Sequence, residues 1–328
     1  MRTTVVRRSV VLIGLCALAC VIAFSSTSAA QVPYQTVVQY TGPGEHPVSV
    51  AVDKVGNVWV SLQPICQVRK YAPNWRELVR MDLVGDCSGD TGASGLAVDA
   101  TGRLYAAVKG SDVTVRGVYE VSPSGGMSRI PGTDQILFPN SIAFDHHNGT
   151  MYVTDMERGA VWRVPRGGSA EVWAEGPVYE GIALFGPRLG ANGIAVDRGE
   201  VVVSVSFPAR VVRIPIRADD SAGEPTVLSL PPDPVANPAL LFAIDDIALD
   251  VFGDVFVSAI AVGGIGRVAA DGSAVQRVAM LPGAVVSLAF GTGKGSRKSL
   301  FVAMNPEFGG SFSGIVKIDA GVPGRPLP

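Results

Sequence analysis

The chain has 328 residues, of which 47% are hydrophobic and 17% charged, so it is too apolar to be a disordered protein and long enough to bury a large core. Its net charge is −2 and no basic block follows residue 8, which argues against a nucleic-acid-binding surface. The 39 glycines and 23 prolines indicate many tight turns and few long helices. Three histidines leave little material for a His-rich zinc site or a Ser-His-Asp triad: His46, His146 and His147.

Residues 1–30 have the pattern of a secretory signal peptide. Basic residues precede an apolar run over residues 10–24, and small residues occupy the −3 and −1 positions of a cleavage site after Ala30. The apolar run is shorter than the roughly 20 residues that a membrane span needs. We therefore expect export to the periplasm or the extracellular space, with no integral membrane span in the mature chain. A lipid anchor at Cys20 and a twin-arginine signal at Arg7 are the alternatives.

Removal of the signal peptide leaves two cysteines, Cys66 and Cys87. In an exported domain such a pair predicts a disulfide, which would close a loop of about twenty residues and contribute on the order of 3 kcal/mol. Two buried free thiols are the alternative.

A sequence unit recurs six times after the signal peptide. Each copy has a small or polar residue, an apolar residue, Ala, another apolar residue and usually Asp, followed by a Gly-containing turn and a β-branched or aromatic strand. The repeat alanines stand at 51, 97, 143, 195, 248 and 289, in steps of 46, 46, 52, 53 and 41 residues. Repeats of about 40 to 50 residues with four strand-like segments are typical of β-propeller blades. We therefore predict an all-β fold in which residues 31–328 form a single six-bladed β-propeller with four-stranded antiparallel blades.

The repeat also predicts local roles and the closure of the ring. Alanine suits the innermost strand, where bulky side chains from neighbouring blades would collide. The sixth copy is followed by only one further strand, over residues 314–318, so residues 36–40 are expected to supply the missing outer strand and leave no open edge. The aspartates of the first five copies are expected to hold the turn after the inner strand: Asp53, Asp99, Asp145, Asp197 and Asp250.

The residue three positions before each repeat alanine is expected at one mouth of the central channel. These six axial residues are Val48, Ser94, Asn140, Asn192, Asp245 and Val286. Three consecutive blades thus offer Asn, Asn and Asp, whose oxygen atoms suit Ca²⁺ or another hard divalent ion. The alternative is that these side chains only cap neighbouring backbone turns.

Two longer spacers lead into the blades of Asn192 and Asp245, over residues 175–190 and 231–242. Because their side chains are largely apolar, we expect them to cover the channel mouth as a lid, with Phe185 and Phe242 contacting a substrate. The alternative is that they pack on the propeller face.

The loops between the second and third strands of each blade should open on the same face as the axial residues. They contribute Lys109, Asp155, Glu157, Phe207, Arg210, Asn305 and Glu307. Arg210 is expected to bind substrate, together with Asp246 beside the axial Asp245. Glu157 or Glu307 is a candidate for a general acid, a general base or an additional ligand.

The pattern resembles the SMP-30/gluconolactonase/LRE-like family of six-bladed propellers over nearly the whole mature chain. The segments that carry the resemblance are Pro139–Ala143, Gly190–Val196 and Asp245–Asp250. The resemblance implies that Asn140, Asn192 and Asp245 hold a catalytic divalent metal, with Ca²⁺ the expected ion, and that Asp245 and Asn192 are catalytic.

The sequence departs from the family pattern on the first blade. The family has a Glu there, where this chain has Val48, and Glu45 lies three residues too early. Because Ca²⁺ affinity falls as the number of charged ligands decreases, this departure leaves weak or absent metal binding as the alternative. The pair Asp245–Asp246 also resembles a branch of these propellers that includes fungal proteins similar to hetero-Diels–Alderases, which orient an apolar substrate.

Three functions follow as hypotheses. The first is a metal-assisted hydrolase of a lactone or related ester. The second is a metal-independent, cyclase-like enzyme acting on a small molecule, and the third is a non-catalytic binding propeller. In each case we expect a small-molecule partner and a monomeric protein.

Overall fold

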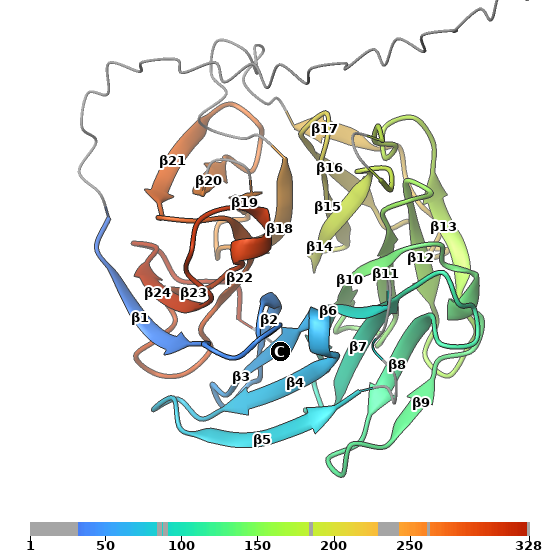
Figure 1. Cartoon of the computed structure of the whole chain (residues 1–328). Helices are drawn as coiled ribbons and strands as arrows, with labels where there is room; N and C mark the ends of the chain where they lie inside the picture. Colours follow the sequence, from blue (N-terminus) through green and yellow to red (C-terminus); the bar gives the residue numbers. More distant parts are fainter. Residues whose placement is uncertain are drawn as a thin grey trace, which may run out of the picture. The chain divides into compact units, whose positions relative to one another are not determined.

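The computed structural model describes residues 32–83, 87, 91–183, 186–228, 243–260 and 263–326. The predicted signal peptide, Phe185 and Phe242 lie outside these residues. Within them the chain forms six four-stranded antiparallel sheets arranged in a ring, so the predicted six-bladed β-propeller is confirmed (Figure 1). No helix in these ranges is long and apolar enough to span a membrane.

The first three blades follow one another along the chain, each running from its inner to its outer strand. The first blade consists of β2 (Pro47–Val52), β3 (Val58–Leu62), β4 (Gln67–Tyr71) and β5 (Glu77–Asp82). The second consists of β6 (Gly92–Val98), β7 (Leu104–Lys109), β8 (Gly117–Val121) and β9 (Met127–Arg129). The third consists of β10 (Pro139–Phe144), β11 (Met151–Asp155), β12 (Ala160–Val164) and β13 (Glu171–Glu175).

The other blades keep this order, except that the last takes its outer strand from the start of the domain. The fourth blade consists of β14 (Ala191–Asp197), β15 (Glu200–Val205), β16 (Arg210–Pro215) and β17 (Thr226–Leu228). The fifth consists of β18 (Ile244–Leu249), β19 (Val255–Ala259), β20 (Gly264–Val268) and β21 (Val275–Met280). The sixth consists of β22 (Val285–Phe290), β23 (Ser299–Met304), β24 (Gly314–Asp319) and β1 (Tyr34–Gln39). Short 3₁₀ helices follow β3, precede β10 and follow β23: η1 (Gln63–Ile65), η2 (Thr133–Gln135) and η4 (Pro306–Phe308).

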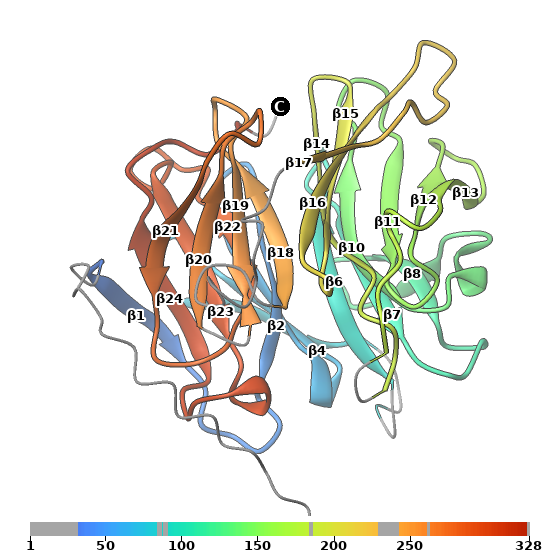
Figure 2. The same cartoon turned by 90° about the horizontal axis from the view of Figure 1, so that it is seen from above.

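The pairing of β1 with β24 is antiparallel and confirms the predicted ring closure. It gives β24 a partner on its outer side, where it would otherwise present an open sheet edge. Seen from above in Figure 2, the strands run from one face of the ring to the other. Arg325, close to the last described residue of the chain, lines the axial channel.

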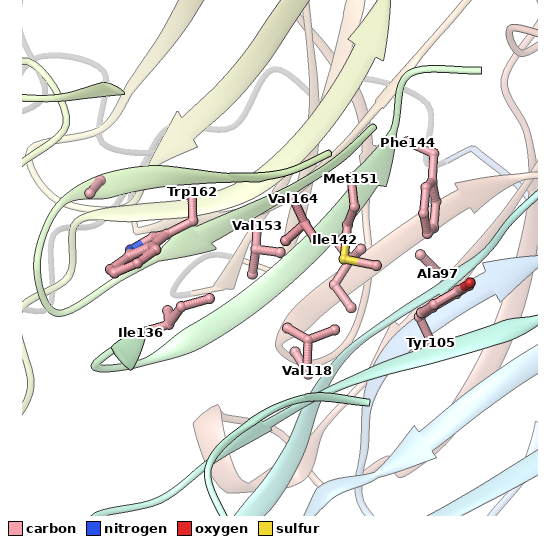
Figure 3. Packing of buried hydrophobic residues seen from close by; sticks show 12 residues of the cluster. Ala97, Tyr105, Val118, Ile136, Ile142, Phe144, Met151, Val153, Trp162 and Val164 are labelled. Atoms are coloured by element: carbon pink, nitrogen blue, oxygen red, sulfur yellow. The ribbon is translucent and has the colours of Figure 1, made fainter. Parts of the chain in front are cut away.

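The inner strands form the wall of the central channel. All six repeat alanines line it, as their small size led us to expect. The hydrophobic core lies between neighbouring blades, where large side chains from two sheets pack face to face. Figure 3 shows one such layer, in which Tyr105 and Val118 of the second blade face Ile142, Phe144 and Met151 of the third.

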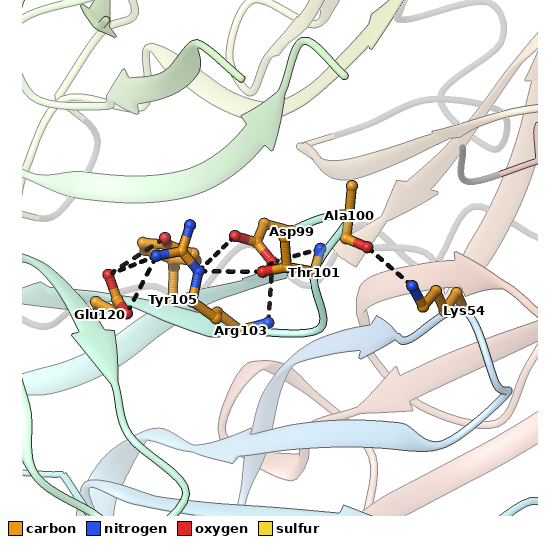
Figure 4. A network of polar contacts seen from close by, with 7 residues as sticks. All are labelled: Lys54, Asp99, Ala100, Thr101, Arg103, Tyr105 and Glu120. Carbon is orange, nitrogen blue, oxygen red and sulfur yellow. Dashed lines mark hydrogen bonds and ion pairs between the residues drawn. The ribbon is translucent and has the colours of Figure 1, made fainter. Parts of the chain in front are cut away.

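The repeat aspartates stabilise turns in most blades, as predicted. Asp99 accepts hydrogen bonds through Oδ1 from the backbone N–H groups of Thr101 and Arg103, both at 2.9 Å, and its other oxygen accepts from the Arg103 side chain (Figure 4). Asp53, Asp145 and Asp250 accept backbone N–H groups in the same way. Asp197 differs, because its turn is shorter and its carboxylate forms an ion pair of 2.6 Å with Arg325.

Candidate active site

All six axial residues line one cavity of about 460 Å³ at the channel mouth opposite the repeat turns. The polar ones, Asn140, Asn192 and Asp245, come from consecutive blades. Val48 and Val286, from the first and sixth blades, contribute apolar surface to the same cavity. The structure therefore brings together the three residues that the sequence pattern selected as ligands.

A β-bulge in every inner strand explains how these side chains reach the cavity. The register of each inner strand shifts near the axial residue, as between Ile244 and Ile247 in β18. Because the bulge breaks the alternation of side chains, the residue after the axial one also faces the cavity in three blades. Asp246 thus lines the cavity beside Asp245, as do Ser49 beside Val48 and Ser141 beside Asn140.

Hydroxyl groups on the second strands hold these bulges. Ser204 of β15 accepts a hydrogen bond of 2.7 Å from Gly193 N and donates to the backbone oxygen of Asp245 in the next blade. Thr154 of β11 does the same for Ser141 N and the backbone oxygen of Asn192. Each of these hydroxyls therefore fixes the bulge of its own blade and the axial residue of the next.

Gly193 shows how closely the neighbouring blades approach. A Cβ atom at this position would lie 2.7 Å from the backbone oxygen of Asp245. A larger residue here would push the fifth blade away from the site.

The polar side chains form a connected chain of hydrogen bonds. Asn140 Nδ2 donates to Asn192 Oδ1 at 2.5 Å, and Asn192 Nδ2 donates to Ser206 Oγ at 2.7 Å. Asn192 is buried, with 5% of its surface exposed, so its amide is held in one orientation by partners on both sides. Ser206 also lines the cavity and was not predicted from the sequence.

Asp246 is bound from several sides by the sixth blade and by its own strand. Its Oδ2 accepts from Ser287 Oγ at 2.5 Å and from Leu288 N at 3.4 Å, while its Oδ1 accepts from Ile247 N at 2.9 Å. These bonds make it a link between the fifth and sixth blades. A substrate that binds Asp246, as expected, would therefore share a carboxylate that already accepts three hydrogen bonds.

Burial raises the pKa values of both carboxyl groups. For Asp245 burial is the largest cause, the charge of Asp246 adds to it, and a hydrogen bond from Asn192 opposes it. Burial likewise raises the pKa of Asp246 to about 6, against the lowering effect of Ser287 and two backbone N–H groups. Both side chains are partly exposed, but they line the cavity and are surrounded by protein, so the open water that would stabilise two negative charges is largely missing.

The donor types of Asn140, Asn192 and Asp245 fit a hard divalent ion, because they offer amide and carboxylate oxygens from three sides of one cavity. The charge of the set is low. Glu45 does not compensate for Val48, because its carboxylate forms an ion pair with Arg69. The described residues contain no group of three or more His, Cys, Asp or Glu side chains that could hold a metal. Oδ1 of Asn192 also accepts a hydrogen bond from Asn140, so an ion would compete with this amide pair.

The first long spacer reaches the cavity as expected. Gly186, Pro187 and Leu189 line it, whereas Tyr179 of the same spacer is buried in the core between the third and fourth blades. Among its described residues, the spacer therefore combines both alternatives, since some of them line the cavity and Tyr179 packs on the propeller. The spacer over residues 231–242 lies outside the described residues, and Ala243 directly after it lines the cavity.

Arg210 does not line the cavity. Its guanidinium donates to the backbone oxygens of Val178, Pro208, Pro177 and Glu180, and burial lowers its pKa. The structure thus places Arg210 beneath the first spacer, where it fixes the backbone of residues 177–180. Its expected contact with substrate has no geometric support.

The other loop residues fall into two groups. Lys109 lines the cavity, with its Nζ 5.2 Å from the centre of the Phe138 ring. Asp155, Glu157 and Asn305 instead accept hydrogen bonds from backbone N–H groups of the loops. Glu307 forms an ion pair of 2.8 Å with His46. None of the three acidic side chains, Asp155, Glu157 and Glu307, lines the cavity that contains Asp245.

The sequence analysis missed Ser206, the second-strand hydroxyls and several apolar lining residues. A signal for the hydroxyls exists: four of the six second-strand motifs carry Ser or Thr at the same place, Ser61, Thr154, Ser204 and Ser258. The apolar residues Met156, Ile260 and Phe308 come from loops that no repeat aligns, so the pattern gives no signal for them.

No family model and no curated protein matches this chain. Solved structures do match it. A gluconolactonase from Xanthomonas campestris is 16% identical, with a TM-score of 0.63, over 89% of this chain and 91% of that one. A luciferin-regenerating enzyme is 12% identical, with a TM-score of 0.68, over 90% and 98%.

A virginiamycin B lyase from Staphylococcus aureus is 14% identical, with a TM-score of 0.59, over 88% of this chain and 99% of that one. At these identities the likeness concerns the fold. The gluconolactonase and the luciferin-regenerating enzyme fit the family resemblance seen in the sequence, and all three structures share their fold with nearly the whole of this chain.

Proposed function

We propose that the protein is an exported hydrolase of a lactone or related ester, assisted by a divalent cation that Asn140, Asn192 and Asp245 hold. The observation that carries this proposal is the convergence of these three side chains, from consecutive blades, on one cavity of ligand-binding size. The likeness to a gluconolactonase fold is in keeping with it. Ca²⁺ is the ion that we propose, because every donor is an oxygen atom.

The residues of the site have distinct parts in this proposal. When bound, a divalent ion supplies a Lewis acid for the substrate carbonyl and lowers the pKa of a water molecule. Asn192, fixed by Ser206, orients Asn140, and Asp245 contributes the negative charge of the ligand set. The apolar side chains of Val48 and Val286 help to keep bulk water from the reacting atoms.

Metal content and thermal melting of the mature protein test the proposal. We expect about one equivalent of divalent metal, a melting temperature that falls in EDTA and recovers in excess Ca²⁺, and hydrolysis of some lactones or esters. Asp245→Asn should abolish both the metal effect and the activity. Asp271→Asn, in an exposed turn, is the matched control and should leave both unchanged.

A metal-independent enzyme is the second candidate. It is favoured by the hydrogen bond that the side chain of Asn140 donates to the side chain of Asn192, and by Val48 in place of an acidic ligand on the first blade. Here Asn192 and Asp245 orient the substrate by hydrogen bonds alone. Turnover that is indifferent to EDTA, in a protein without metal, would overturn the metal proposal in favour of this one. Binding of small molecules without any turnover would favour a binding propeller instead.

A further inference from the structure

The lining of the cavity is divided into a small polar patch and a larger apolar wall. The patch consists of Asn140, Asn192, Ser206 and the two adjacent aspartates. The facing wall, from the fifth, sixth and first blades, consists of Ile260, Val286, Phe308 and Val48. Phe138, Met156 and Leu189 extend the apolar surface around the patch itself.

Several polar groups of the lining already have protein partners. Ser94 Oγ donates to the backbone oxygen of Pro139 at 2.6 Å, and Ser49 Oγ accepts from Leu96 N at 3.0 Å. Asn192 is held on both sides, and Asp246 has its three donors. Outside the patch and these serines, the polar lining residues are Ser141, next to Asn140, and Gln63 and Lys109 on the first two blades.

Apolar side chains also continue from the cavity toward solvent. Phe308, which lines the cavity, is 53% exposed. Leu137, next to the lining residue Phe138, is 47% exposed, and Ile182, whose backbone oxygen accepts from Leu189 N, is 45% exposed. Exposed apolar side chains that adjoin a cavity are typical of a binding surface for an apolar ligand.

We infer that the site takes a lactone or ester carried on an apolar body, such as an alkyl or aromatic group, and not a polyhydroxylated sugar lactone. This inference rests on the proposed function for the identity of the reacting group. One carbonyl group can be placed at the polar patch while the rest of the molecule contacts the facing wall. Several hydroxyl groups could not find partners on that wall, and each one left without a partner lowers affinity by roughly tenfold.

A series of γ-lactones that share the ring and differ in the substituent tests the inference. Ethyl, butyl and hexyl chains are compared with a substituent of similar length that carries hydroxyl groups. We expect kcat/KM to rise about fourfold for each methylene group that the cavity buries, with the hydroxylated lactone at least tenfold below the hexyl compound. A flat series, or a preference for the hydroxylated lactone, would overturn the inference.

Binding of the corresponding γ-lactams, measured by calorimetry, separates this inference from the proposed function. If no lactone is hydrolysed, the proposed function fails, but the affinities of the lactams still report the preference of the cavity. Tighter binding with each added methylene supports the inference, and equal or undetectable binding of all lactams contradicts it.

A variant of the apolar wall provides the structural control. Val48→Asn should flatten the dependence on chain length, whereas Val55→Asn, at a turn residue that is 65% exposed, should leave it unchanged. If Val48→Asn does not fold, Ile260→Thr tests the same wall from the fifth blade. A chain-length dependence that survives in a folded wall variant would contradict the assignment of the alkyl chain to this wall.

Discussion

The carboxylate of Asp155 is fully buried at the end of β11 and accepts hydrogen bonds from the backbone N–H groups of Leu137, Phe138 and Arg158, at 2.9, 3.0 and 3.1 Å. It therefore holds the loop that carries Phe138 into the cavity. Asp155→Ala would leave three backbone donors without this partner, and we expect it to lower the free energy of unfolding by about 3 kcal/mol. Urea denaturation measures this change.

Asp112→Ala is the control for this prediction, because Asp112 also accepts a backbone N–H group but lies in an exposed turn. It should leave the unfolding midpoint nearly unchanged. Equal midpoints for the two variants would show that the buried carboxylate is not a structural anchor.

The ion pair of Glu45 and Arg69 makes stability depend on pH. The hydrogen bond from Arg69 lowers the pKa of Glu45 below its ordinary value of 4.5, although burial opposes this effect. A carboxyl group whose pKa is lowered by folding stabilises the protein above the pKa of the unfolded chain, and this stabilisation is lost as the pH falls through the folded value. Glu45→Gln should therefore lower the free energy of unfolding by about 1 kcal/mol at pH 7.

This difference between Glu45→Gln and the unchanged protein should shrink as the pH falls below about 4.5. Urea denaturation between pH 7 and pH 3 measures it, with Glu224→Gln, at an exposed position, as the control. A difference that is independent of pH would mean that Glu45 stabilises the protein by packing and not by its charge.

At the scale of the strands, the repeat predicts much of the architecture and part of the site. It aligns six copies, so the axial positions follow by counting, and Asn140, Asn192 and Asp245 do meet in one cavity. Asp246, expected beside Asp245, also lines the cavity. The bulges are set by hydrogen bonds between blades, which the repeat does not reveal, so the entry of Ser206 into the cavity required the structure.

The loops between the strands were harder to predict, because a charged residue there can serve either the backbone or a ligand. The guanidinium of Arg210 donates to four backbone oxygens of its own surroundings, which no sequence pattern distinguishes from an exposed, ligand-binding arginine.

The predicted disulfide joins two segments at the edge of the candidate site. Cys66 and Cys87 are bonded, with their Cα atoms 5.6 Å apart, and this pairing replaces the alternative of two free thiols. Cys66 directly follows η1, whose Gln63 lines the cavity. Because the bond closes a loop across 21 positions, replacing both cysteines by serine should lower the free energy of unfolding by about 3 kcal/mol.

Thermal melting with and without a reducing agent measures the contribution of the disulfide. The unchanged protein should melt at a lower temperature when reduced, and the double serine variant should not respond to the reductant. If the reductant shifts the melting temperatures of both proteins equally, the shift does not come from this disulfide.

At the scale of the whole propeller, stability depends on the closure of the ring. Each inner strand contacts the inner strands of both neighbouring blades, so the six sheets support one another in a circle. The last blade is complete only through β1, whose residues are mostly exposed and pair with β24 by backbone hydrogen bonds. The contribution of β1 therefore comes mainly from pairing, and only a smaller part from burial of its side chains.

Removal of β1 tests this dependence directly. A chain that begins at Tyr40 keeps a residue of the core but leaves β24 with an open edge. We expect the free energy of unfolding to fall by about 4 kcal/mol, a large share of the 5 to 15 kcal/mol typical of a folded domain, and the open edge to promote association. Urea denaturation and size-exclusion chromatography measure the two effects.

A chain that begins at Val32 retains β1 and is the control. A synthetic peptide of residues 32–39 should restore stability to the shortened chain by pairing with β24. If the chain that begins at Tyr40 matches the control in stability and remains monomeric, the contacts between the inner strands alone stabilise the ring. The pairing of β1 with β24 is then dispensable for the stability of the propeller.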